Sequence, residues 1–248
     1  MVNSPTAPDP ATGLATMTDS IHLARNYYRW IYRQIAPDLG RRLVDIGGGT
    51  GNILPFVLER EAVIVVDPSA ECLAAVRRRF PAQANLSTLQ GDICDPALIA
   101  SLAPARADTI LCTNVLEHIP DDRLAVRHMA DLLKPQRGRL IILVPAHPAL
   151  YGTLDRAAGH FRRYQPQQLE ALLHENGMAL DRIRHMNILG ALGWWFNGKV
   201  VRDPDLNSRS MNQQILWFDR LAIPFLERVE RVVRIPFGLS LIAVGRVA

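Results

Sequence analysis

The sequence predicts an α/β protein built on a Rossmann-like, seven-stranded and mainly parallel sheet. Three observations indicate this fold. An apolar run at residues 43–46 passes directly into a glycine-rich turn at residues 47–51, and a second apolar run at residues 63–66 ends at an acid, Asp67. Further strand-like runs then alternate with segments of helical spacing. Continuous apolar strands joined by helices are typical of a parallel sheet covered on both faces.

The elements follow in order along the chain. Residues 1–16 hold three prolines among small polar residues and are expected to form a disordered leader. A helix is expected next, at residues 19–36, where apolar positions recur at helical spacing and Pro37 ends the pattern. Later helices are expected at residues 50–60, 69–80, 96–102, 121–133 and 166–176, and later strands at or near residues 90, 112, 138–145, 180–186 and 239–244.

Length and composition favour one domain with an appendage. A chain of 248 residues that is 48% hydrophobic can bury one complete α/β core. We therefore divide it into a leader (1–16) and a single domain (17–248). That domain comprises a cap helix (17–37), a cofactor-binding core (38–187), a helical insertion (188–237) and a last strand (238–248). The insertion is much longer than the connection that the last strand needs.

Charge and cysteine usage narrow the class of protein. The net charge of +4 is mild, and the longest basic run, residues 77–79, falls at the predicted end of a helix, where cations are favoured. This pattern favours a solvated helix over a nucleic-acid surface. The three cysteines lack metal-ligand or redox spacing, which predicts reduced thiols in a cytoplasmic protein. The sequence shows neither a membrane-span pattern nor a signal-peptide pattern.

The glycine turn indicates which cofactor binds. A dinucleotide fingerprint that starts at Gly47 and Gly49 needs its third glycine at position 52, but Asn52 stands there and the glycine falls earlier, at Gly51. Asp67, at the end of the second strand, can accept hydrogen bonds from both hydroxyls of a ribose. The loop therefore fits a nucleoside cofactor other than a dinucleotide.

The pattern Asp45, Gly47, Gly49 and Gly51 resembles motif I of the class I S-adenosylmethionine-dependent methyltransferases, in the small-molecule subgroup related to UbiE. The resemblance covers residues 41–145 well and the remainder loosely. It implies S-adenosylmethionine as cofactor, S-adenosylhomocysteine as product, and a ribose contact for Asp67.

Later motifs extend the resemblance. It implies that Asp92 bonds the adenine amino group and that Ile93 packs on the adenine ring. It also implies that residues 112–119, with Asn114 and Val115, run beneath the methionine part of the cofactor. Asn114 is followed by Val115 and Leu116 rather than by the Asn-Pro-Pro-aromatic sequence of DNA amino-methylases, so we expect no nucleic-acid substrate.

Residues 145–164 are dense in groups that can serve a methyl acceptor. His160 is the first choice for a general base, with Tyr164 or Tyr151 to orient it or the acceptor. Arg162 and Arg163 can meet a carboxylate or phosphate of the substrate. His147, between two prolines, is the second candidate base. The alternative is a loop that only shapes the pocket, because methyl transfer can proceed by positioning alone. Clustered acids are missing from this stretch, so no metal is implied.

Aromatic residues at two places are candidates for the acceptor pocket. Tyr28 lies in the cap helix with Tyr27 and Trp30, although an aromatic stripe is more often ordinary packing. Trp194 and Trp195 lie in the apolar patch at residues 188–196, ahead of an amphipathic run at residues 213–233. This insertion is expected to be either a substrate lid or a face for a dimer or a membrane surface.

These inferences predict methyl transfer to an apolar, natural-product-like or lipid-like small molecule, most readily at oxygen or carbon, in a biosynthetic pathway of secondary metabolism. Two alternatives stay open: a cyclisation or rearrangement without net methyl transfer, and a non-catalytic interaction subunit. Contact with a membrane surface is not favoured at this stage. The expected oligomeric state is a monomer or a homodimer.

Overall fold

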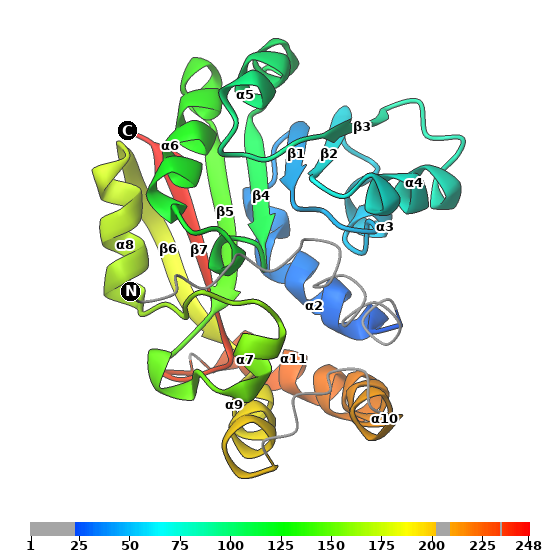
Figure 1. Ribbon diagram of the computed structural model, residues 1–248, viewed down its shortest axis with the longest axis vertical. Helices are drawn as coiled ribbons and strands as arrows, with labels where there is room; N and C mark the ends of the chain where they lie inside the picture. The colour runs from blue at the N-terminus through cyan, green and yellow to red at the C-terminus, as the bar shows by residue number, and fades with distance from the viewer. Residues whose placement is uncertain (1–22, 202–208, 234) are drawn as a thin grey trace, which may run out of the picture.

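The computed structural model describes residues 23–201, 209–233 and 235–248. The expected leader and the expected start of the cap helix lie outside these residues. A seven-stranded sheet forms the centre of the molecule, in the order β3-β2-β1-β4-β5-β7-β6 (Figure 1). Its strands are β1 (Arg42–Ile46), β2 (Ala62–Asp67), β3 (Leu86–Gln90), β4 (Thr109–Thr113), β5 (Arg139–Pro145), β6 (Met178–Met186) and β7 (Ser240–Val247).

The neighbouring strands are parallel except where β7 is involved, because β7 runs antiparallel to both β5 and β6. The expected mainly parallel, seven-stranded α/β fold is confirmed. The carboxyl ends of β1 to β5 therefore lie at one edge of the sheet, which is where an open α/β fold binds its ligands.

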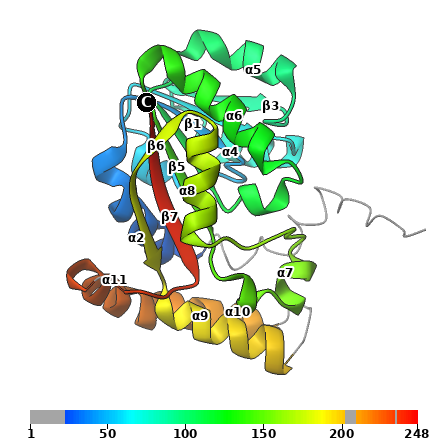
Figure 2. The ribbon, with the colours of Figure 1, turned by 90° about the vertical axis from the view of Figure 1, so that its left-hand side faces the viewer.

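Helices cover both faces of the sheet. Residues of α5 (Pro96–Leu102), α6 (Asp122–Leu133) and α8 (Pro166–Glu175) share one buried apolar cluster. Residues of α2 (Arg25–Ile35), α3 (Leu54–Val57), α4 (Ala70–Arg79) and α11 (Ile223–Val232) share the other. The remaining helices, α7 (Thr153–Ala157), α9 (Ile188–Trp195) and α10 (Arg209–Trp217), lie at the lower end in Figures 1 and 2.

Side-chain caps set three of the crossover helices where the sequence predicts them. Ser69, Asp95 and Asp121 each precede a helix, and each side chain accepts a hydrogen bond from a backbone N–H of the first turn. The helix expected at residues 50–60 is much shorter, since α3 has only 4 residues. Its start is delayed because Gly47, Gly49 and Gly51 all have positive φ angles, which an α-helix does not accommodate.

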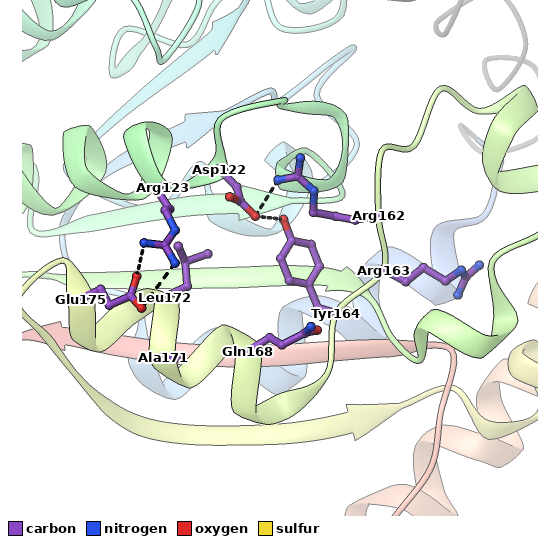
Figure 3. A pocket seen from close by; sticks show the side chains of 9 residues that line it. All are labelled: Asp122, Arg123, Arg162, Arg163, Tyr164, Gln168, Ala171, Leu172 and Glu175. Atoms are coloured by element: carbon purple, nitrogen blue, oxygen red, sulfur yellow. Dashed lines mark hydrogen bonds and ion pairs between the residues drawn. The ribbon is translucent and has the colours of Figure 1, made fainter. Parts of the chain in front are cut away.

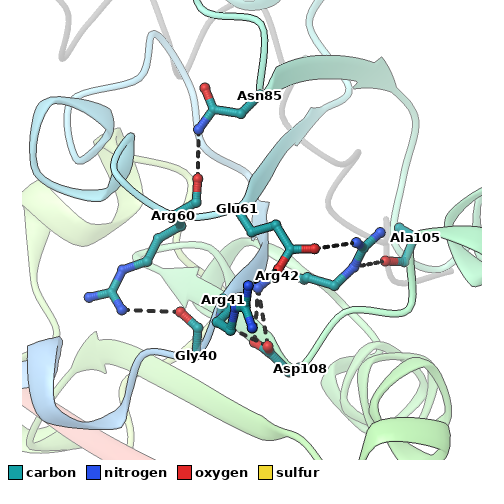
Figure 4. A network of polar contacts seen from close by, with 8 residues as sticks. All are labelled: Gly40, Arg41, Arg42, Arg60, Glu61, Asn85, Ala105 and Asp108. Atoms are coloured by element: carbon teal, nitrogen blue, oxygen red, sulfur yellow. Dashed lines mark hydrogen bonds and ion pairs between the residues drawn. The ribbon is translucent and has the colours of Figure 1, made fainter.

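The amino edge of the sheet is held by a network of charged groups (Figure 4). Asp108 accepts hydrogen bonds from the backbone N–H groups of Arg41 at 2.8 Å and Arg42 at 3.1 Å. The Arg42 guanidinium in turn contacts the Ala105 carbonyl at 2.8 Å and Glu61 at 3.0 Å. These groups pair with one another at the edge opposite to the glycine loop, so we assign this network to structure.

Two stretches of the insertion, residues 188–201 and 209–233, are described, and both are helical. π-Helical turns follow α9 at Phe196–Val201 and separate α10 from α11 at Phe218–Ala222. Among the described residues, no helix combines the length and the apolar character that crossing a bilayer requires.

Candidate functional site

The glycine loop after β1 leaves one open position. A side chain at Gly47 (φ 65°) would meet Val115 at 2.3 Å, and one at Gly51 (φ 79°) would meet Leu54 at 2.6 Å. Gly49 (φ 54°) has no neighbouring atom within 4 Å of the place where a Cβ would stand. The outer two glycines thus permit close packing, whereas Gly49 borders open space in which a ligand can approach the backbone.

Asp67 anchors this loop from the end of β2. One carboxylate oxygen accepts the Gly49 N–H at 2.9 Å, and the other accepts the Ser69 N–H at 2.9 Å. Burial raises the pKa of Asp67, while the two backbone hydrogen bonds act in the opposite direction. Each oxygen keeps a second lone pair, so the carboxylate can still accept from hydroxyl groups placed above Gly49.

Asp45, at the end of β1, is buried without a hydrogen-bond partner. Its side chain is 1% exposed, and neither carboxylate oxygen has a partner among the described residues. Burial, and then the nearby charge of Asp67, raise its pKa to about 7. A buried, unpartnered carboxylate beside an open glycine position fits a cofactor that brings a cationic group, because a cation stabilises the ionised form.

The remaining expected cofactor residues lie along the same edge. Asp92 is exposed after β3 and accepts the Cys94 N–H at 2.9 Å, whereas Ile93 is buried in the core. Asn114 is exposed after β4 with a φ of 54°, and its N–H donates to the Leu143 carbonyl at 2.8 Å. Val115 touches the loop at Gly47. The structure thus brings the ends of β1, β2, β3 and β4 to one groove edge, as motif order predicts.

Helix α2 covers this edge, and the insertion holds it in place. The carboxylate of Asp219 accepts the backbone N–H groups of Asn26 at 3.3 Å and Tyr27 at 2.8 Å, which are among the N–H groups that the first turn of α2 leaves unpaired. Tyr28 lies over the glycine loop, where its hydroxyl accepts from the Asn52 side chain at 3.2 Å. The sequence suggested Tyr28 for the acceptor pocket, but this hydrogen bond places its hydroxyl at the glycine loop instead.

Tyr27 fits the acceptor side better than Tyr28 does. Burial raises its pKa to about 12, while hydrogen bonds with Ser240 and Asn114 lower it and the charge of Glu117 raises it. Its hydroxyl is therefore neutral at physiological pH and lies near Glu117 and Asn114. Helical spacing alone does not distinguish two adjacent tyrosines, because the face that each presents depends on how α2 packs.

The imidazole of His160 is held by a buried carboxylate. Its Nδ1 lies 3.0 Å from Asp155 Oδ1, and its side chain is 9% exposed. An Nδ1–H that donates to Asp155 leaves the lone pair on Nε2, the tautomer that a general base needs. The closest carboxylate to Nε2 is Glu117 Oε1 at 4.0 Å, which is beyond hydrogen-bonding distance.

Asp155 gathers several further donors. It accepts from Arg163 Nε at 2.7 Å, from the Gly152 N–H at 2.9 Å and from the indole N–H of Trp194 at 3.1 Å. Burial alone would raise its pKa, but these groups and His160 outweigh burial and place the pKa below its ordinary value. Asp155 therefore stays ionised and can hold His160 in one orientation.

Two expected substrate contacts are corrected by these pairings. The Arg163 side chain is 1% exposed, and it also donates to the Ala146 carbonyl at 3.0 Å, so it is an internal partner of Asp155. Arg162 pairs with Asp122 at 2.7 Å and donates to the Pro120 carbonyl at 2.7 Å. Both guanidinium groups are thus committed to the protein, and neither is arranged to meet a substrate anion.

Three further expectations about this stretch also change. The Tyr164 hydroxyl contacts Asp122 at 2.9 Å and the Leu116 carbonyl at 3.3 Å, so it does not orient His160. The Tyr151 hydroxyl donates to the His160 carbonyl at 2.7 Å and thus fixes the backbone of His160 rather than the acceptor. The ring of His147 is stacked against His185 and Phe237, so these two rings are its immediate partners.

A pocket of about 310 Å³ lies on the other side of Tyr164 (Figure 3). Two ion pairs line this pocket: Arg123 with Glu175 at 2.8 Å, and Arg162 with Asp122 at 2.7 Å. In Figure 3 the Arg163 side chain points away from this group. The pocket lies between α6 and α8, apart from the glycine loop, so we do not place the cofactor there.

Glu117 and His118 are functional candidates that sequence reasoning undervalued. Glu117 is buried, and one of its oxygens has no hydrogen-bond partner in the part of the chain that the structure describes. Burial raises the pKa of Glu117 to about 7 despite the lowering effect of His160. Burial and then His160 lower the pKa of His118 to about 4. The ligand atoms of Glu117, His118 and His160 lie within 4.8 Å of one another, so this trio can also hold a metal ion.

Comparisons with known proteins agree with this geometry. A methyltransferase domain family matches residues 20–183. A ubiquinone biosynthesis O-methyltransferase of Stutzerimonas stutzeri is 26% identical over 166 residues, which cover 62% of this chain and 71% of that protein. A ubiquinone/menaquinone biosynthesis C-methyltransferase, UbiE, of Rubrivivax gelatinosus is 31% identical over 134 residues, which cover 54% of this chain and 50% of that protein.

Solved structures show the same fold. The complex of a methyltransferase activator with a methyltransferase from Haloferax volcanii gives a TM-score of 0.62 at 16% identity, covering 96% of this chain and 94% of that one. The YcgJ protein of Bacillus subtilis gives a TM-score of 0.58 at 18% identity, covering 89% of this chain and 98% of that one. At such identities the similarity concerns the fold alone.

The chain belongs to the class I S-adenosylmethionine-dependent methyltransferases. It is therefore an enzyme of the predicted class, and S-adenosylmethionine is its cofactor. Among the described residues, the open position at Gly49, the loop-anchoring acid Asp67 and the unpartnered Asp45 fit this cofactor, whose methionine end carries a cationic sulfonium. The family match ends at residue 183, before the insertion that begins at α9.

Proposed function

We propose that this enzyme methylates a hydroxyl group of an apolar small molecule, with His160 as the general base. S-Adenosylmethionine supplies an electrophilic methyl group, and the chain must hold the acceptor and remove its proton. The observation that carries the proposal is the buried Asp155–His160 pair, whose Nε2 faces the Glu117 side of the site. The relatives named as O-methyltransferases support oxygen as the acceptor atom.

The residues around His160 fit proton removal. A proton taken from the acceptor hydroxyl by Nε2 produces an imidazolium between two carboxyl groups, Asp155 at 3.0 Å and Glu117 at 4.0 Å. Both are buried, so they stabilise that charge more strongly than a solvated pair would. Asp155 acts as a positioning residue, because its contact with His160 is made through Nδ1.

The acceptor class follows from what surrounds this pair. Both candidate guanidinium groups are committed to internal ion pairs, so the described residues offer neither of them as a free cation for an anionic substrate. Tyr27 and Trp194 contribute aromatic surface instead, and Trp194 stacks beside Arg163. We therefore expect a phenol or quinol with an apolar substituent, bound in the cytoplasm or from a surface facing it.

The proposal is tested by turnover of the purified enzyme with phenolic and quinol acceptors that carry apolar chains of increasing length. Release of S-adenosylhomocysteine together with a product heavier by one methylene group supports methyl transfer. His160→Ala should reduce kcat by roughly 10²–10⁴-fold with cofactor binding intact. His160→Gln should not restore activity, and His174→Ala, at an exposed position of α8, serves as the matched control.

Two further measurements separate this mechanism from its competitors. Asp155→Asn should lower kcat and displace the acid limb of the pH–rate profile, because the imidazole loses its orienting charge. A chelator should leave turnover unchanged if His160 is a base. Activity that disappears with chelator and returns with a divalent cation would instead assign Glu117, His118 and His160 to a metal and overturn the base mechanism. A product without an added methyl group would favour rearrangement.

A further inference from the structure

We propose that the insertion docks this enzyme on a membrane surface that contains anionic lipids. The inference concerns the outer side of α9, α10 and α11, and it is independent of which acceptor is methylated. Figures 1 and 2 both place these three helices together at the lower end of the molecule, beyond the carboxyl edge of the sheet.

Large exposed apolar side chains gather on these helices. We call this set the insertion face. Apart from Leu23, every exposed large apolar side chain among the described residues belongs to it. Its members are Leu189, Leu192, Trp195, Phe196, Val200, Val201, Trp217, Leu221, Phe225, Val229, Val232 and Val233. So many exposed apolar groups on one segment mark a surface that binds something.

The face has the periodicity of an amphipathic helix lying on a surface. Trp217 is 71% exposed, and Leu221 and Phe225 follow at steps of four residues, with Phe225 62% exposed. The opposite side of this helical segment lies in the core, where Ile223 and Leu226 of α11 are buried with residues of α2 and the sheet. A helix with one side in its own core and an apolar stripe outside can insert that stripe shallowly into a bilayer.

The distribution of charge favours an anionic partner. Within the described part of the insertion, the acids Asp219, Glu227 and Glu230 are all buried, where they meet α2 or the start of α9. The cations Lys199, Arg220 and Arg228 are exposed. The outer side therefore presents apolar groups with positive charges, and its acids are turned inward.

This charge pattern also argues against a second copy of the chain as the occupant. In a two-fold dimer this face would contact the same face of the second copy. Exposed cations would then lie opposite cations, and the described part of the insertion has no exposed acid to pair with them. A lipid surface bearing phosphates supplies the negative charge that the face lacks.

The internal contacts make the face a fixed platform. Glu230 accepts the backbone N–H groups of Asn187 at 3.1 Å and Ile188 at 3.2 Å, which caps α9 and joins it to α11. Arg184 donates to the Glu230 carbonyl at 2.8 Å, which ties α11 to β6. The apolar stripes of the two helices are thus held on the rigid core.

The test uses the full chain and vesicles of phosphatidylcholine, with and without phosphatidylglycerol, in a flotation assay. We expect binding to the anionic vesicles that weakens as salt is raised. Replacing Trp217, Leu221 and Phe225 together with Ser should reduce binding by on the order of a hundredfold. Arg220→Glu with Arg228→Glu should reduce it by roughly tenfold and remove the preference for anionic lipid.

The matched control places the same charge reversals elsewhere. Arg78→Glu with Arg127→Glu, at exposed positions of α4 and α6, should bind vesicles like the parent to within about threefold. Absence of vesicle binding by the parent would overturn the proposal, as would equal loss in the control. A concentration-dependent dimer in sedimentation that the triple Ser variant abolishes, without vesicle binding, would assign the face to a second copy. Turnover with a short water-soluble acceptor should survive all of these substitutions, which separates this proposal from the proposed reaction.

Discussion

Asp45→Asn tests the electrostatics of the cofactor groove most directly. The carboxylate is buried and has no hydrogen-bond partner within residues 23–201, 209–233 and 235–248, and burial raises its pKa from 3.8 to about 7. A raised pKa in the folded state means that the stability linked to Asp45 is fully present below pH 3.8 and is lost as the pH rises to about 7. Asn has nearly the same shape and cannot ionise, so the variant should not show this loss.

The magnitude follows from linkage. Compared with a side chain that stays neutral, the raised pKa of Asp45 lowers the parent's free energy of unfolding by about 1.7 kcal/mol near pH 5 and by about 4.3 kcal/mol near pH 8.5. The difference in free energy of unfolding between Asp45→Asn and the parent should therefore grow by about 3 kcal/mol in favour of the variant between these two pH values. This change corresponds to about 6–12 °C in Tm. Glu117 titrates in both proteins and cancels in the difference.

Thermal unfolding of the two proteins at matched pH values, without cofactor, measures this change. Glu170→Gln, at an exposed position of α8, serves as the control for removing one acid elsewhere on the protein. S-Adenosylmethionine should narrow the gap, because a cation near Asp45 favours the ionised carboxylate. Parallel pH dependence in Asp45→Asn and the parent would show that Asp45 is not a buried, unpartnered acid, and the reasoning would fail.

Three further outcomes are expected. Asp67→Asn should weaken S-adenosylmethionine binding by about tenfold or more in calorimetry, since a charge-assisted contact to the ribose is lost; unchanged affinity would refute the ribose assignment. Tyr27→Phe should raise the KM for the acceptor while leaving cofactor affinity unchanged, and the reverse pattern would place Tyr27 on the cofactor. Trp194→Phe removes one donor from Asp155 and should displace the acid limb of the pH–rate profile, whereas Trp195→Phe should not.

Local signals in the sequence predict the fold well. Strands β1, β2, β4 and β5 contain apolar runs that the sequence shows directly. The starts of α4, α5 and α6 are set by Ser69, Asp95 and Asp121, whose caps act over two or three residues. The edge that carries the cofactor motifs was predictable from topology, because neighbouring parallel strands bring their carboxyl ends to the same edge of the sheet. The short α3 was not, since successive left-handed glycines extended the loop further than the apolar pattern suggested.

The acceptor site depended on contacts between distant segments. The sequence placed His160, Tyr164 and Arg163 close together, but it did not reveal that Tyr164 turns to Asp122 and Arg163 to Asp155. Asp155, the single acid between residues 145 and 164, is the centre of the network. Likewise, Asp219 caps a helix that lies more than 190 residues earlier, and no local pattern reports such a contact.

The two proposals together give the insertion both a pocket-side role and a docking role, because adjacent indoles face opposite ways. Trp194 turns inward and donates to the carboxylate that holds His160, whereas Trp195 is 48% exposed on the insertion face. Helix α9 thus contacts the proposed base on one side and belongs to the proposed docking surface on the other. An acceptor with an apolar chain can keep that chain in the lipid while its ring reaches His160, so the enzyme need not extract the whole molecule. Turnover of long-chain acceptors should then depend on anionic vesicles and on the insertion face, while turnover of short-chain acceptors should depend only on the Asp155–His160 pair.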